Sequence, residues 1–315
     1  MSLALPDRIP DYVLEALPGS RVREPDESGF VEDEAGVRVY WEAFGDSDDV
    51  VCLLPPWALG HSRGWRAQVP YLSRHFRVIT IDPRGNGRSD RPEHAAAYSR
   101  AAHVGDTLAV LDATGTDSAM MVSVSPRGAL GLDLAANHAD RVRASVFVTP
   151  QLWAERDFLD WFKGGRREGY DGTSKMNPHY WREDFRGFVE WFARWASPHR
   201  HSMRQIEEIV HHGLGTDAET LIRATVGFEM YEREEALATA RRVRCPVLVT
   251  QNGGKAMYPK HTSGPLAEAT GGRLHVFEGL GPAIASRWPV AMNIVVREFL
   301  ESVRAGDAVG REAVA

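Results

Sequence analysis

The sequence predicts an α/β protein with a mostly parallel sheet, helices on both of its faces and a helical insertion. Short apolar runs alternate with helix-like patterns through the first half of the chain, which is typical of a parallel sheet. The alternation stops over residues 151–242, where aromatic residues gather without a strand pattern, and then resumes. We therefore expect an α/β core over residues 1–150, an aromatic-rich helical cap over 151–242, and the second part of the core over 243–315.

Each element of the core follows from a local pattern. After a charged, proline-containing lead-in over residues 1–28, two strand-like runs form a hairpin, and the later runs are continuously apolar, as in buried strands. The expected strands are residues 29–32, 37–44, 50–54, 77–81, 119–124, 144–148, 245–250 and 274–277. Helical spacing predicts helices over residues 61–74, 100–113, 129–139, 259–269 and 289–303.

Composition narrows the class of protein. The 315 residues are 43% hydrophobic and 25% charged, with a net charge of −6 and no basic tract, so we expect no nucleic-acid partner and no membrane partner. No apolar run reaches the length of a membrane span, and the first residues lack the pattern of a signal peptide. Cys52 and Cys245 fall in apolar strands and predict no disulfide framework. These features indicate a soluble, cytoplasmic protein.

Ser125 marks the corner between the strand 119–124 and the helix that follows it at once. A serine at such a corner occupies the position of a nucleophile elbow, where a sharp turn exposes the hydroxyl. The same residues also fit a structural role, because serine is favoured as a helix N-cap and Pro126 as the first helical residue.

Three features together resemble the α/β-hydrolase superfamily. They are the strand that opens into the turn DPRGNGRSD at residues 82–90, the elbow further along the chain, and the helical insertion after the next strand. The resemblance spans about residues 37–300 and implies an α/β-hydrolase fold whose insertion caps the active site. It also implies a serine nucleophile, a histidine base, an acid that orients the base, and an oxyanion hole.

The sequence departs from the family pattern at the elbow. The pattern Gly-x-Ser-x-Gly falls on residues 123–127, so that Ser125 is kept and both glycines are replaced. Pro126 follows the serine, at the position whose backbone N–H is an oxyanion donor in the family, and proline has no N–H. Losing one such donor typically costs about a hundred- to a thousandfold in rate. The backbone amide of Trp57 would supply the other donor.

The resemblance assigns the acid and the base to positions that hold other residue types. Lys255 stands where the acid is expected, and Pro282 stands where the histidine is expected. The fallback position for the acid holds Pro150 and Gln151. The resemblance therefore implies a degenerate triad and argues against standard ester or amide hydrolysis.

Other groups remain available at the site. Arg127 would bring a positive charge to the pocket floor, suited to a carboxylate, phenolate or enolate, or it would turn aside to a carboxylate on a loop. His61 would act as a general base at the pocket mouth, or it would be a solvent-facing histidine at a helix start. The candidate catalytic residues are Ser125, Arg127 and His61, and the candidate substrate-binding residues are Trp57, Trp153, Trp181, Pro126 and Lys255. We expect no metal site, because no carboxylate or cysteine completes a set with His199, His201, His211 and His212.

The aromatic cap indicates an apolar pocket for a planar or polycyclic small molecule. The first expected function is a cofactor-independent, non-hydrolytic enzyme that promotes cyclisation, carbon–carbon coupling or rearrangement of a bulky aromatic or polyketide-like substrate. The resemblance implies that such repurposed members exist in bacterial natural-product biosynthesis, including antibiotic pathways. The alternatives are an unconventional or weak hydrolase that uses Ser125 or a water activated by His61, and a non-catalytic small-molecule-binding protein. A homodimer is left open.

Overall fold

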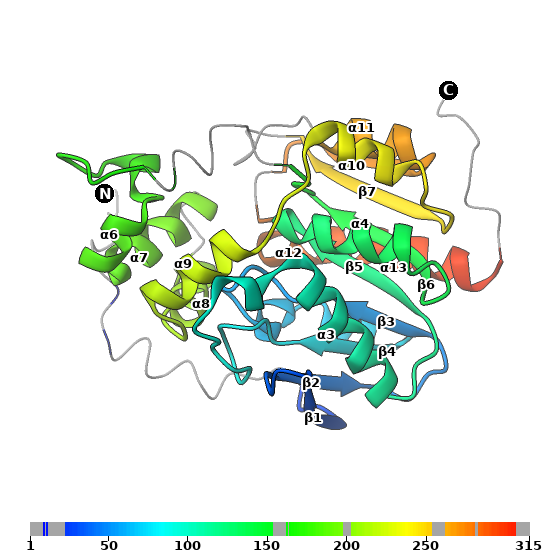
Figure 1. The fold of residues 1–315 in the computed structure, drawn as a ribbon. Coiled ribbons are helices and arrows are strands. Elements are labelled where there is room, and N and C mark those ends of the chain that lie inside the picture. Colours follow the sequence, from blue (N-terminus) through cyan, green and yellow to red (C-terminus); the bar gives the residue numbers. More distant parts are fainter. Residues whose placement is uncertain are drawn as a thin grey trace.

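The computed structural model of the chain describes residues 9, 11, 23–153, 162, 164–197, 203–253, 262–280 and 283–306. Its centre is an eight-stranded sheet in the order β1-β2-β4-β3-β5-β6-β7-β8 (Figure 1). The strands are β1 (Glu27–Glu32), β2 (Arg38–Phe44), β3 (Val50–Leu53), β4 (Arg77–Ile81), β5 (Ala119–Val124), β6 (Val142–Val148), β7 (Val247–Asn252) and β8 (Arg273–Phe277). β1 and β2 pair antiparallel at one edge, and β4, β3, β5, β6, β7 and β8 run parallel.

Helices cover both faces of the sheet, because its central strands are apolar on both sides. One face packs against α3 (Arg100–Ala113), α4 (Gly128–Asn137), α10 (Arg233–Ala240) and α11 (Ser263–Thr270). These four helices lie along one side of the sheet in Figure 1. The other face packs against α2 (Val69–Leu72), α12 (Ile284–Arg287) and α13 (Pro289–Arg304). Short 3₁₀ turns, η1 (Ser62–Trp65), η2 (Ala95–Tyr98), η3 (Ser125–Arg127) and η4 (Gly172–Lys175), lie between these elements.

A helical layer lies to one side of the sheet and has a core of its own. It contains α6 (Pro178–Glu183), α7 (Phe185–Ala196), α8 (Met203–Gly213) and α9 (Ala218–Gly227) (Figure 1). Buried apolar residues of these helices pack with Ala58, Leu59 and Tyr98, which belong to loops at the carboxyl edge of the sheet. The cap is therefore attached to the loops that follow β3 and β4. Within the range expected for the cap, α10 packs with the core, where Ala236 and Ala240 contact the face covered by α4.

The predicted fold class is confirmed: this is an α/β-hydrolase fold with a mostly parallel sheet and an inserted helical region. One predicted helix is wrong. Residues 61–74 form two short pieces, η1 and α2, in place of one helix. Pro70 lies in the first turn of α2, where its missing N–H is tolerated, and a proline at that point disfavours a continuous helix running through it.

None of the described helices has both the length and the apolar character needed to cross a membrane.

Candidate active site

A cavity of about 310 Å³ lies where the carboxyl ends of β5, β6 and β7 meet the cap. This edge of a parallel sheet is where α/β folds bind their ligands. Ser125 follows β5, Thr149 follows β6 and Asn252 ends β7, and all three line the cavity. Trp57, from the loop after β3, and Phe192, from α7, close it from the cap side. The cavity therefore joins the core to the cap.

Strained backbone gathers at this cavity. Among the described residues, the non-glycine residues with positive φ are Ser125 at 51°, Thr149 at 44° and Ala283 at 57°, and each lines the cavity. A left-handed conformation costs a non-glycine residue about 1 kcal/mol or more, and the cost is greater for β-branched Thr149. Such residues cluster at functional sites, since the surrounding structure must hold them in place. The cavity is thus the leading candidate for the site.

Ser125 adopts an elbow conformation. The N-cap residue of η3 is Val124, no side chain caps that turn, and Ser125 is in the left-handed region. The interpretation of Ser125 as a helix N-cap is therefore wrong. Its carbonyl oxygen accepts a hydrogen bond from Gln151 N at 3.0 Å, which holds the elbow against the loop after β6.

The residues around the elbow explain how it tolerates the lost glycines. The Ser123 hydroxyl donates to Val146 O at 3.3 Å, so the first replacement fits between β5 and β6. The close approach falls at Gly128, the residue after Arg127, where an added Cβ would meet Pro150 Cβ in the loop after β6 at 3.0 Å. The elbow keeps its shape because position 128, where a side chain would crowd Pro150, is still a glycine.

The two oxyanion positions differ in what they offer. Pro126 lines the cavity and has no N–H to donate. Trp57 also lines the cavity, and its backbone N–H forms no hydrogen bond to another described residue. The Trp57 indole donates to Thr225 Oγ1 at 3.1 Å and packs against Phe192, with ring centroids 5.6 Å apart. Trp57 thus forms part of the wall with its ring and presents one unused backbone donor.

His61 lines the cavity beside a second histidine. Its ring centroid is 4.3 Å from that of His212 on α8, which also lines the cavity. His61 Nδ1 lies 3.8 Å from Asp82 Oδ1 and accepts from Arg63 N at 3.4 Å. Burial, followed by the nearby positive groups, lowers the pKa of His212 well below its ordinary value, so His212 is neutral near pH 7.

Asp82 is fixed by the turn that the sequence singled out. Its carboxylate accepts from Ser62 N and Arg88 N, each at 2.9 Å, and its carbonyl accepts from the Ser89 hydroxyl at 2.8 Å. Gly87 has a φ of +62°, and a Cβ there would lie 2.2 Å from Asp82 Oδ2. The turn therefore needs glycine at that position in order to hold the carboxylate beside His61.

Arg127 does not reach the cavity. It is 1% exposed, and its guanidinium lies over the Phe228 ring, 4.1 Å from the centroid. The expectation of a positive charge at the pocket floor is wrong, and so is the alternative of a surface ion pair, because the side chain turns inward. Its Nε donates to Pro56 O at 3.2 Å. Burial lowers the pKa of Arg127 to about 9, so it keeps its charge at neutral pH.

The other predicted binding residues divide into three groups. Trp57 and Pro126 line the cavity. Trp181 and Trp153 are absent from its described lining: Trp181 is buried inside the cap, 4.4 Å from the ring of Phe188, and Trp153 pairs with Tyr231 on the core. Lys255 lies outside the described residues, as does Pro282. The aromatic pattern of the sequence does not distinguish residues that pack inside the cap from residues that line the cavity.

Sequence reasoning missed several lining residues. They are Thr149, Asn252, His212, Ile209, Phe192, Ser263 and Ser286. Thr149 and Asn252 were within reach of the sequence, because they fall at the carboxyl ends of predicted parallel strands, the edge at which ligands bind. The cap residues were not, since their position depends on how α7 and α8 pack.

The described lining residues carry no Asp, Glu, Lys or Arg. They combine apolar side chains with hydroxyl, amide and imidazole groups, a surface that suits an uncharged ligand. A volume of about 310 Å³ is at the lower end of ligand pockets, which run from about 300 to 1,000 Å³. The cavity therefore suits a small molecule better than the polycyclic one that the aromatic cap suggested.

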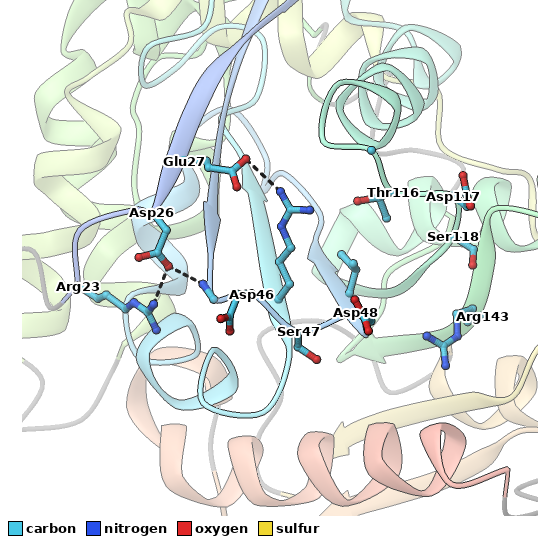
Figure 2. Close-up of a pocket in the computed structure, with 14 residues that line it drawn as sticks. Arg23, Asp26, Glu27, Asp46, Ser47, Asp48, Thr116, Asp117, Ser118 and Arg143 are labelled. Atoms are coloured by element: carbon cyan, nitrogen blue, oxygen red, sulfur yellow. Dashed lines mark hydrogen bonds and ion pairs between the residues drawn. The ribbon is translucent and has the colours of Figure 1, made fainter.

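A charged hollow of about 780 Å³ lies at the amino ends of the strands, opposite the cavity (Figure 2). Figure 2 shows Asp26 bonded to Arg23, at 2.6 Å, and Glu27 reaching an arginine, which is Arg77 at 3.1 Å. Within the described ranges, no three His, Cys, Asp or Glu side chains are arranged to hold a metal ion.

The fold, the elbow and the cavity define a protein of the α/β-hydrolase class. The model of the α/β-hydrolase fold family matches residues 49–284, and the chain belongs to that family. A protein named as a candidate carbamate hydrolase, RutD, from Caulobacter sp. (strain K31) is 28% identical over 270 residues, 83% of this chain and 95% of the relative. The 2-hydroxymuconate semialdehyde hydrolase of Pseudomonas sp. (strain CF600) is 39% identical over 84 residues, 27% of this chain and 29% of the relative.

Solved structures share the fold at low identity. The enol-lactonase from Burkholderia xenovorans LB400 superimposes with a TM-score of 0.70 at 20% identity, covering 87% of this chain and 100% of that one. An esterase from Rhodococcus sp. ECU1013 also gives a TM-score of 0.70, at 22% identity, covering 88% of this chain and 99% of that one. The relatives are hydrolases, whereas the first expected function was non-hydrolytic.

Proposed function

We propose that the protein is a hydrolase of small, uncharged acyl compounds, an ester or a lactone, with Ser125 as the nucleophile. The observation that carries the proposal is the left-handed backbone of Ser125 at the cavity wall. A serine that served only to start a helix would not need this strained conformation. In a nucleophile elbow, the same conformation exposes the serine hydroxyl. The described lining carries no Asp, Glu, Lys or Arg, which favours an uncharged substrate, and the names of the two relatives favour hydrolysis.

The proposed chemistry assigns a role to three groups. The Ser125 hydroxyl oxygen attacks the carbonyl carbon and gives its proton to His61 Nε2, while the carbonyl oxygen takes up negative charge and accepts from the Trp57 N–H. Collapse of this intermediate expels the alcohol, which takes the proton back from His61. A water molecule then attacks the acyl-serine and loses a proton to His61. The bond between the acyl carbon and Ser125 Oγ breaks, Ser125 Oγ takes the proton from His61, and the acid is released.

Asp82 supports His61 in this scheme. To accept a proton at Nε2, neutral His61 must carry its own proton on Nδ1, the nitrogen 3.8 Å from Asp82 Oδ1. Arg63 N–H competes for that nitrogen at 3.4 Å. Both distances are longer than those of good hydrogen bonds. In many enzymes, hydrogen bonds between catalytic residues shorten when the substrate binds. Formation of the imidazolium would draw the His61 ring toward Asp82, which the turn holds in place.

A non-hydrolytic reaction is the second candidate, and the sequence favours it at specific positions. Lys255 and Pro282 stand where the resemblance assigns the acid and the base, and Pro126 removes an oxyanion donor. On this alternative the cavity would position an uncharged substrate for rearrangement or coupling, and the Ser125 hydroxyl would be dispensable.

Hydrolysis of 4-nitrophenyl acetate and 4-nitrophenyl butyrate by the wild type and Ser125→Ala separates the two candidates. The proposal expects slow turnover that saturates with ester and disappears in Ser125→Ala. Turnover that persists in Ser125→Ala would overturn Ser125 as the nucleophile, and turnover that is absent from the wild type would leave the non-hydrolytic candidate.

A further inference from the structure

Arg127 has one hydrogen bond among the described residues, and that bond is to the loop that carries Trp57. Its Nε donates to Pro56 O at 3.2 Å, while Nη1 and Nη2 are buried without a partner in the described part of the chain. Phe228 offers its ring face to the guanidinium at 4.1 Å. A charged group buried with so few partners is costly to the fold, so its one directed contact calls for an explanation.

The neighbours of Arg127 do not supply a salt bridge that would explain it. Asp106 is the carboxylate whose charge acts on Arg127, yet both of its oxygens accept hydrogen bonds from Arg84, at 2.7 and 2.6 Å. His103 is buried nearby with neither ring nitrogen bonded to a described residue. Arg127 is therefore directed at the Pro56 carbonyl in preference to an acid.

Peptide geometry links that carbonyl to the cavity. The described chain contains no cis peptide bond, so the carbonyl of Pro56 and the N–H of Trp57 belong to one planar trans unit and point in opposite directions. Arg127 lies in the interior, and the carbonyl points toward it. The N–H of Trp57 must then point away from the interior, and both Pro56 and Trp57 line the cavity.

We propose that Arg127 is a positioning residue that holds the Pro56–Trp57 peptide with its N–H directed into the cavity, as the remaining oxyanion donor. This inference rests on the proposed function, in which that N–H receives the charge of the acyl oxygen. It assigns a role to a residue that replaces a glycine of the family pattern. The replacement stands next to Pro126, which removes the other oxyanion donor. Arg127 would thus hold the Trp57 N–H in place in a site where the second N–H is missing.

The loop itself needs such an anchor. Pro55 and Pro56 have no N–H, so neither can tie the loop to the sheet through a backbone donor. Leu54 N bonds to Val122 O at 2.9 Å, and the next backbone bond donated in this loop is from Gly60 N to Trp57 O at 2.8 Å. Between these points side chains hold the loop: Asn86 Nδ2 donates to Ala58 O at 2.9 Å and the Trp57 indole donates to Thr225 Oγ1. Among the described residues, only Arg127 bonds to the Pro56–Trp57 peptide itself.

The test is the binding of benzeneboronic acid to ¹⁵N-tryptophan-labelled protein. The boron atom takes a bond from Ser125 Oγ, the hydroxyl proton passes to the base, and a boronate oxygen occupies the oxyanion position. The Trp57 amide signal is assigned as the one lost in Trp57→Phe. We expect this signal to shift on binding to the wild type, and Arg127→Met to bind boronate roughly a hundredfold more weakly, about the effect of one lost oxyanion donor.

Two variants separate positioning from general stability. Arg127→Lys keeps a donor that reaches toward Pro56 O. It should recover at least a third of the boronate affinity that Arg127→Met loses relative to the wild type. Arg100→Met removes another arginine packed on a ring, 3.8 Å from the centroid of Tyr231, without touching the loop, and should bind boronate as the wild type does. In ligand-free protein, Arg127→Met should also move the Trp57 ¹⁵N signal, because the hydrogen bond on its own peptide is lost.

The outcomes are distinct. Equal boronate affinity in the wild type and Arg127→Met overturns the positioning role and leaves Ser125 chemistry intact. A wild type that fails to bind boronate overturns the proposed function and this inference with it. A Trp57 signal unchanged by Arg127→Met overturns the inference whatever the affinity. If Arg127→Met does not fold, Arg127→Lys decides: a folded Arg127→Lys that binds boronate about a hundredfold or more weaker than the wild type, as expected without any donor, would refute rescue by a donor.

Discussion

His61 Nδ1 lies 3.8 Å from Asp82 Oδ1, with the ring of His61 lining the cavity into which Ser125 turns. This pairing of an imidazole with a carboxylate follows the logic of a catalytic triad on residues outside the family positions. If it provides the base, His61→Gln should lower kcat for 4-nitrophenyl butyrate by about a hundred- to ten thousandfold, the range typical of general base catalysis.

The pH profile distinguishes a base from a structural histidine. The wild type should lose activity toward acid as the base is protonated, and His61→Gln should lose that limb of the profile along with the rate. His94→Gln, which changes an exposed histidine, is the matched control and should behave as the wild type. A His61→Gln enzyme that keeps both the rate and the acid limb would remove His61 from the mechanism.

Pro126→Ala should make the enzyme faster. The substitution restores a backbone N–H at the oxyanion position, and one donor is worth about a hundred- to a thousandfold in rate. We expect a gain of tenfold or more in kcat, with little change in KM, since the donor acts mainly in the transition state. Pro150→Ala alters another proline of the lining without supplying this donor and should show no gain. No acceleration in Pro126→Ala would mean that the oxyanion does not lie at this elbow.

Ser125→Gly should stabilise the fold while it abolishes turnover. Glycine adopts the φ of +51° without the steric cost, so the free energy of unfolding should rise by up to about 1 kcal/mol. Ser125→Ala removes the same hydroxyl but keeps the Cβ, so it should lose turnover without the gain in stability. Urea unfolding of the two variants measures the difference. Equal stability of the glycine and alanine variants would show that the elbow is unstrained.

Buried neutral histidines should make the fold sensitive to mild acid. Burial lowers the pKa of His103 and of His212 well below the ordinary value, whereas in the unfolded chain both titrate near 6.5. Below about pH 6.5 the unfolded state therefore binds protons that the folded state does not, and the free energy of unfolding falls as the pH falls. Each group contributes up to about 1.4 kcal/mol per pH unit.

Urea unfolding between pH 7 and pH 5 measures this loss. His103 and His212 together contribute part of the slope of the free energy of unfolding against pH. His212→Gln should remove roughly half of that part, because one of the two titrating residues is lost. His94→Gln should leave the slope unchanged, since that side chain is exposed in the folded protein. A wild-type stability that is flat over this range would contradict the neutral state of the buried imidazoles.

Most of the core could be predicted, because its strands and most of its helices are encoded locally; the helix predicted over residues 61–74 is the exception. The apolar runs and the turn at residues 82–90 were sufficient to place Ser125 at an elbow. Packing between distant segments could not be predicted. The spacing of aromatics in the cap marks an apolar helix face but does not tell Trp181, buried within the cap, from Phe192, which lines the cavity.

Arg127 shows the same limit for charge. A sequence places an arginine beside the elbow, and solvation costs suggest that it should face solvent or a ligand. The folded chain instead buries it over Phe228, where it binds the Pro56 carbonyl. The contact depends on a loop 71 residues away in the sequence, and no local pattern encodes it.

The role of Ser125 as the nucleophile is tested most directly by mass spectrometry of the protein after reaction with a fluorophosphonate. The reagent forms a bond from phosphorus to the serine oxygen and releases fluoride, which requires an exposed and activated hydroxyl. We expect a single adduct, which peptide mapping places on Ser125. It should form more slowly in His61→Gln and be absent from Ser125→Ala. An unmodified Ser125 after prolonged exposure, with the protein still folded, would contradict its assignment as the nucleophile.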